Sequence, residues 1–102
     1  MLPSAVRIFV CTTPQDMRRS FDGLALATRE LLGEDPQSGA LFVFRGKTAA
    51  RLKVLWWDRN GYCVLYKRLH QASFVLPRGD GPAVRIDGRQ LATLLCGVAH
   101  QQ

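Results

Sequence analysis

Several short segments of the chain alternate hydrophobic and other residues, which is the pattern of strands with one buried face. In the first of these segments, residues 6–12, every second side chain from Val6 onward is aliphatic as far as residue 10. The clearest signal consists of two alternating runs, residues 52–57 and 62–69, on either side of Asn60-Gly61. Because Asn-Gly favours a tight turn between antiparallel strands, these two runs predict a β-hairpin. Short apolar runs at 41–44, 74–76 and 83–86 predict three more strands.

Two other segments carry apolar residues at helical spacing. The first, residues 14–32, starts after Thr13 with a proline at its first position and ends before Gly33. A threonine cap, that proline and an acid three residues after the cap are typical of a helix start, and the glycine is typical of a helix end. The second segment follows Asp87, a suitable cap, and repeats Leu91, Leu94, Leu95 and Val98.

The predicted order of elements is β-α-β-β-β-β-(β)-α. This order favours an α+β fold, with a mainly antiparallel sheet and both helices packed on one face. With 102 residues and 47% hydrophobic residues, the chain is long enough for a single domain, residues 1–102, with a core of its own. A core of this size leaves a modest net stability, so association with a second copy stays an open alternative.

The cysteines indicate a reducing compartment. Cys11, Cys63 and Cys96 are odd in number, far apart and set among apolar neighbours, as expected of buried thiols rather than disulfides. The N-terminal residues have no apolar core of signal-peptide length, and no run approaches the roughly 18 apolar residues of a membrane helix. We therefore expect a cytoplasmic protein that does not enter the membrane.

Positive charge is concentrated in the middle of the chain. The net charge is +6, and residues 40–78 hold eight basic residues against the single acid Asp58, while the rest holds six basic and seven acidic residues. A basic antiparallel ribbon can neutralise DNA phosphates or fit the major groove. The side chains predicted to bind DNA are Arg45, Lys47, Arg51, Lys53, Lys67 and Arg68.

Strand alternation predicts that Arg51 and Lys53 share one face of their strand, with Leu52, Val54 and Trp56 on the other. In the next strand, Lys67 should lie on the face opposite Tyr66 and Arg68. Two alternatives remain open. The aromatic residues, Trp56, Trp57, Tyr62 and Tyr66, either stack on unpaired bases or pack within the core. The strand lysines and arginines either contact phosphates or protect the sheet from edge-to-edge aggregation.

No catalytic residue, metal ligand or cofactor is predicted. His70 and His100 lack zinc-site spacing with any cysteine or with each other. Cys63 with His70 is the one pair that resembles a nucleophile and base, but Cys63 lies in an apolar run, where a thiol is normally inert. The scattered acids are mostly explained by cap and turn positions.

Five ordered sequence blocks resemble the TnpB (second-reading-frame) accessory protein of the sixty-six family of bacterial insertion sequences. The blocks are Asp16–Leu24, Leu41–Gly46, Lys53–Asp58, Tyr66–Leu69 and Phe74–Pro77, and the resemblance runs from about residue 6 to residue 95. This chain differs in two places: Ser20 stands where the family usually has glycine, and the turn after Arg45 is less basic.

The resemblance implies a protein encoded beside a larger transposase that carries the nuclease chemistry, and needed for transposition. It carries over no active site. The basic positions in matching blocks are Arg18, Arg19, Arg45, Lys53, Lys67 and Arg68. Two hypotheses follow: an accessory module that binds insertion-sequence ends through the basic meander, or a subunit that docks on the transposase and does not contact DNA. The second is motivated by Arg18, Arg19 and Trp57, together with Trp56 and Phe74.

Overall fold

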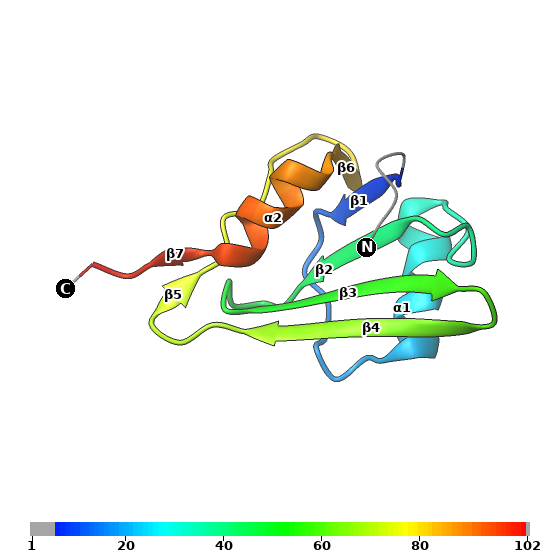
Figure 1. Cartoon of the computed structure of the whole chain (residues 1–102), viewed down its shortest axis with the longest axis horizontal. Helices are drawn as coiled ribbons and strands as arrows, with labels where there is room; N and C mark the ends of the chain where they lie inside the picture. Colours follow the sequence, from blue (N-terminus) through cyan, green and yellow to red (C-terminus); the bar gives the residue numbers. More distant parts are fainter. Residues whose placement is uncertain (1–5, 102) are drawn as a thin grey trace.

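A five-stranded sheet forms the centre of the molecule, and the computed structural model describes residues 6–101 (Figure 1). The strands lie across the sheet in the order β4-β3-β2-β1-β6. All neighbours pair antiparallel except β1 and β2, which are parallel. An α+β fold with a mainly antiparallel sheet is therefore confirmed. The bounds are β1 Ile8–Cys11, β2 Leu41–Arg45, β3 Arg51–Asp58, β4 Gly61–Arg68 and β6 Ala83–Ile86.

A helical crossover joins the parallel strands β1 and β2, as parallel pairing requires. It contains α1 (Phe21–Ala27), which continues as the π-helical turn η1 (Thr28–Leu32) and ends at Gly33 in the left-handed conformation. The predicted helix start at Thr13 is wrong. The Gln15 amide instead donates to the Arg45 carbonyl at 2.8 Å. This bond holds the segment against the end of β2, so the helix begins only after it.

The two helices cover opposite faces of the sheet, and the prediction that both pack on one face is wrong. On the α2 side the core includes Ile8, Val10, Leu41 and Val43, and on the α1 side it includes Phe9, Cys11, Phe42 and Phe44. Residues 8–11 of β1 and 41–44 of β2 are apolar and buried on both faces. A helix on one side alone would leave the other set of side chains in water.

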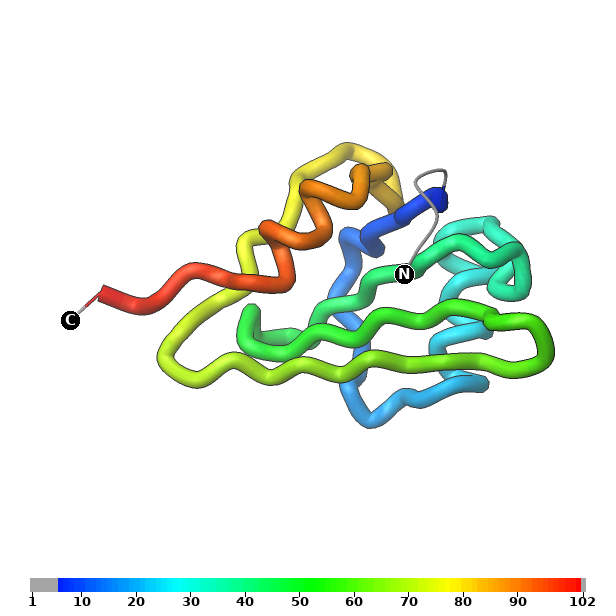
Figure 2. The backbone as a smooth tube through the Cα atoms, viewed as in Figure 1, coloured from blue at the N-terminus to red at the C-terminus, as the bar shows by residue number. Residues whose placement is uncertain are grey.

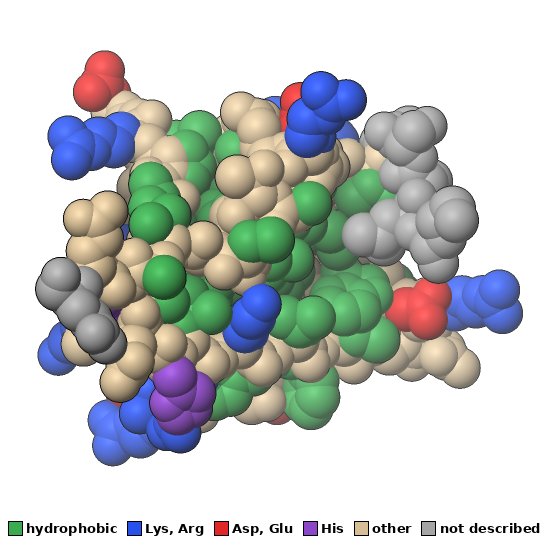
Figure 3. Space-filling model, turned by 60° about the vertical axis from the view of Figure 1, so that its left-hand side comes forward, with side chains coloured by type: hydrophobic (Ala, Val, Ile, Leu, Met, Phe, Trp, Pro, Cys, Tyr) green, Lys and Arg blue, Asp and Glu red, His purple; other side chains and the backbone are tan. Residues whose placement is uncertain are grey.

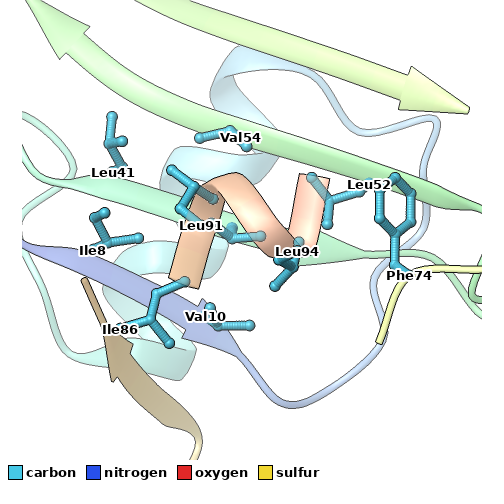
Figure 4. Packing of buried hydrophobic residues seen from close by; sticks show 10 residues of the cluster. Ile8, Val10, Leu41, Leu52, Val54, Phe74, Ile86, Leu91 and Leu94 are labelled. Atoms are coloured by element: carbon cyan, nitrogen blue, oxygen red, sulfur yellow. The ribbon is translucent and has the colours of Figure 1, made fainter. Parts of the chain in front are cut away.

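The second helix, α2 (Gly88–Cys96), begins at the predicted cap. Asp87 accepts from the Gln90 amide, and the Gln90 side chain accepts from the Asp87 amide, both at 2.8 Å. Figure 4 shows Leu91 and Leu94 of this helix surrounded by the aliphatic side chains of the sheet. No helix in residues 6–101 is both long and apolar enough to span a membrane.

The predicted hairpin is confirmed as β3–β4, with a register from Arg51 opposite Arg68 to Asp58 opposite Gly61. The predicted strand at 83–86 is confirmed as β6, but the one at 74–76 is wrong. Two-residue β5 (Ala72–Ser73) instead pairs with β7 (Val98–Ala99) in a separate sheet. Phe74 leaves the pairing because its amide instead donates to the Ala49 carbonyl at 2.7 Å, and its side chain packs in the α2-side core. Figure 2 shows the C-terminal segment running away from the main sheet.

Candidate nucleic-acid interface

Three loops from distant parts of the sequence meet at one end of the sheet. Because β1 and β2 are parallel, the loops that follow them, residues 12–20 and 46–50, lie at the same end. The loop before β6, residues 78–82, joins them: the Thr12 amide donates to the Pro82 carbonyl at 3.0 Å. The strand pairing thus gathers side chains that the sequence separates by more than sixty positions.

Basic side chains predominate at this end. Strand β3 begins here and β4 ends here, so Arg51 and Arg68 lie directly opposite each other. This end carries seven basic residues and two acidic ones, Asp16 and Asp80, so its net charge is +5, compared with +6 for the whole chain. We call this surface the basic end; its cations are Arg18, Arg19, Arg45, Lys47, Arg51, Arg68 and Arg78.

An open groove of about 640 Å³ crosses the basic end. One wall is the loop after β1 and the other is the β2–β3 turn. Met17 closes the floor against Gly46, where an added Cβ would lie 2.8 Å from the Met17 Cγ. The two walls can approach each other because residue 46 has no side chain. The lining residues are Gln15, Asp16, Met17, Arg18, Gly46, Lys47, Thr48, Arg51 and Tyr66.

An ion pair lies on the first wall of this groove. The Arg18 Nη2 is 2.7 Å from the Asp16 Oδ2, and the Arg18 Nε also donates to this carboxylate. These hydrogen bonds from Arg18 lower the pKa of the Asp16 carboxyl well below its usual range. Asp16 therefore stays charged and offsets one cation of the basic end.

Lys53 lies beneath this surface rather than on it. It shares a strand face with Arg51, as alternation predicts, but only 7% of it is exposed. Its Nζ donates to the Arg19 carbonyl at 2.7 Å and lies 4.8 Å from the centroid of the Tyr66 ring. The loop before α1 covers this part of the face, so the prediction of a solvent-facing Lys53 is wrong.

Lys67 points to the opposite, α2-side face. It pairs with Leu52, whose side chain belongs to the α2-side core, and its Nζ donates to the Leu95 carbonyl at 2.8 Å in the last turn of α2. The cations of the hairpin therefore do not form one exposed surface, because Lys53 is buried and Lys67 is exposed on the other face of the sheet. Four of the six predicted DNA-binding residues lie at the basic end: Arg45, Lys47, Arg51 and Arg68.

The three residues predicted to bind a protein partner lie in two separate places. Arg18 and Arg19 lie at the basic end, whereas Trp57 lies near the hairpin turn, edge-on to Tyr62 with 5.0 Å between ring centroids.

Arg78 was not singled out by the sequence pattern. It lines a second hollow at the basic end, of about 470 Å³, together with Arg45. The position of Arg78 beside Arg45 could be predicted only by knowing that β1 and β2 pair in parallel.

The candidate nucleophile and base are not brought together. Cys63 lies near the start of β4 and His70 follows its end, so they are roughly 20 Å apart at about 3.3 Å per residue. The Cys11 thiol donates to the Thr13 carbonyl, and burial raises its pKa. Within residues 6–101, no three His, Cys, Asp or Glu side chains gather as a metal-binding group.

Comparison with known proteins identifies the family. Residues 6–102 match the family described as "IS66 Orf2 like protein". An uncharacterized protein of Sinorhizobium fredii, y4hO, is 45% identical over 100 residues, which cover 96% of this chain and 87% of that protein. A second, y4jC of the same organism, is 33% identical over 93 residues, covering 91% and 80%. No solved structure matches the chain. The chain therefore belongs to the IS66 Orf2-like family, a family of insertion-sequence accessory proteins.

Proposed function

We propose that this protein is a non-catalytic accessory factor of transposition that binds DNA at the insertion-sequence ends through its basic end and so assists the transposase. The observation that carries the proposal is the excess of five positive charges at one end of the sheet. Lysine and arginine side chains there can neutralise phosphates and release the counterions condensed on DNA.

The surroundings of these cations support the proposal that they bind an anionic partner outside the chain. Among the described residues, Arg18 is the one member of the seven that forms an ion pair within the chain. Arg51 and Arg68 are both exposed and directly opposed, an arrangement in which like charges destabilise a sheet. A phosphate between or beside them would relieve this repulsion.

A charge-reversal experiment tests the proposal. We expect the double variant Arg51→Glu with Arg68→Glu to bind element-end DNA at least tenfold more weakly than the natural protein. The matched control, Arg29→Glu with Arg89→Glu, changes the net charge equally but alters exposed helical positions away from the basic end. We expect the control to lose no more than about threefold. Equal losses would mean that affinity follows net charge alone, and would refute a localised site.

A second candidate function is docking on the transposase, because one side of the molecule exposes apolar side chains. Figure 3 shows hydrophobic side chains gathered on the side that carries α2. A groove of about 420 Å³ lies there between α2 and residues 75–77. Val75 and Val98 on its rim are 66% and 58% exposed. Exposed apolar surface of this kind is typical of protein-binding sites.

Co-purification distinguishes the two functions. If docking on the α2 side is correct, Val75→Asp with Val98→Asp abolishes recovery of the protein with the transposase, and Arg51→Glu with Arg68→Glu leaves recovery unchanged. The opposite pattern would exclude docking by this groove.

A further inference from the structure

The four aromatic residues of the hairpin lie in different surroundings. Trp56 packs against the α2-side core, while Trp57 and Tyr62 are partly buried and contact each other. Tyr66 is the exception, since 49% of it is exposed. Of the four, only Tyr66 lines the groove of the basic end.

The Tyr66 ring is supported from beneath. The Nζ of the buried Lys53 lies 4.8 Å from the ring centroid and is itself held by the Arg19 carbonyl at 2.7 Å. Because Lys53 is buried and half of Tyr66 is exposed, the ammonium occupies the inner side of the ring and leaves the outer side to solvent. A lysine over an aromatic ring stabilises it electrostatically, which favours this ring orientation before any ligand arrives.

The cations around this ring are placed to hold a phosphate backbone. Arg18, Lys47 and Arg51 line the same groove as Tyr66. A positively charged groove with an exposed aromatic ring is the combination that proteins use for single strands, where a base stacks on the ring and phosphates contact the cations. In a duplex, the faces of the bases are already stacked on one another and cannot reach such a ring.

We propose that the groove binds an unpaired stretch of DNA, with Tyr66 stacking on one base. This inference rests on the DNA-binding function proposed above and specifies its substrate class as a single strand rather than a duplex.

Fluorescence anisotropy with a labelled single-stranded oligonucleotide and the corresponding blunt duplex tests this inference. We expect the natural protein to bind the single strand more tightly. We expect Tyr66→Ala to weaken single-strand binding by roughly 5- to 150-fold, because stacking contributes about 1–3 kcal/mol per base. Its duplex affinity should change less than twofold, and Tyr66→Phe should keep near-natural affinity for both.

Leu65→Ala is the matched control, because this neighbouring residue is also exposed but points to the α2 side of the sheet. Thermal unfolding by circular dichroism establishes that each variant is folded. If Tyr66→Ala leaves single-strand affinity unchanged, or lowers both affinities equally, the inference is overturned while DNA binding stands. If neither form of DNA binds at low salt, both the inference and the proposed function fail.

Discussion

The opposed pair Arg51 and Arg68 should cost the protein stability when no DNA is bound. Cross-strand pairs of opposite charge contribute roughly 0.2–1 kcal/mol, and like charges are destabilising by a similar amount. Both side chains are exposed, and solvent screening keeps such pairs in the lower part of that range. Arg68→Glu should therefore raise the free energy of unfolding by about 0.5–1 kcal/mol. For a chain of this size, that corresponds to a Tm increase of about 2–8 °C.

Thermal unfolding at low and high salt measures this effect. Arg68→Gln, which has the same length as the glutamate variant but no charge, removes the repulsion without adding an attraction. We expect the order of Tm at low salt to be glutamate above glutamine above arginine, with the differences shrinking in high salt because screening weakens each interaction. A lower Tm for Arg68→Glu, or differences that do not depend on salt, would refute this electrostatic reasoning.

Substitutions at four further positions test the packing and the cap of α2. Leu24→Ala should lower the free energy of unfolding by about 2–5 kcal/mol in chemical denaturation, because Leu24 lies fully buried on the sheet-facing side of α1. Leu26 is half exposed, so Leu26→Ala should change this free energy by less than about 0.5 kcal/mol, and similar losses for the two variants would contradict the assigned helix face. Lys67→Met should lower the free energy of unfolding by about 0.5–1.5 kcal/mol, because it removes the hydrogen bond to the Leu95 carbonyl in α2. Its DNA affinity, measured by titration, should change less than twofold. A larger loss of affinity would mean that Lys67 contacts DNA. Asp87→Ala should cost about 0.5–2 kcal/mol and Asp87→Asn much less; an equal cost for both would argue against the cap.

Local patterns in the sequence predicted the hairpin well. The alternating runs around Asn60-Gly61 set both the strand pairing and the faces of Arg51, Lys53 and Lys67, because side chains on a strand must alternate. Asp87 was likewise recognisable as a cap, since its hydrogen bond is made within its own turn.

The burial of Lys53 was not predictable in the same way. Alternation gives the face on which a side chain lies but not what covers that face. The loop that covers Lys53 was expected to be helical, because Thr13 and Pro14 look like a helix start. Its backbone instead bonds to the end of β2, a tertiary contact that a local pattern does not contain.

The basic end depends on a topology that the sequence left undecided. An antiparallel meander would have kept the charges along one ribbon. The parallel β1–β2 pair brings Arg18 beside Arg51 at the start of β3, and Arg78 beside Arg45 at the end of β2. One signal was available: the unbroken apolar run Leu41–Phe44, which indicates a strand buried on both faces and hence a helix on each side.

The most direct test of the account is the salt dependence of DNA binding by the natural protein. If about four to seven of the basic-end side chains contact the phosphates of a single strand, the slope of log Kobs against log salt concentration should lie between about −3 and −5. Arg51→Glu with Arg68→Glu should make this slope shallower by at least about one, and Arg29→Glu with Arg89→Glu should leave it unchanged. Binding with a flat salt dependence, or no binding at low salt, would contradict the claim that these cations form a DNA-binding surface.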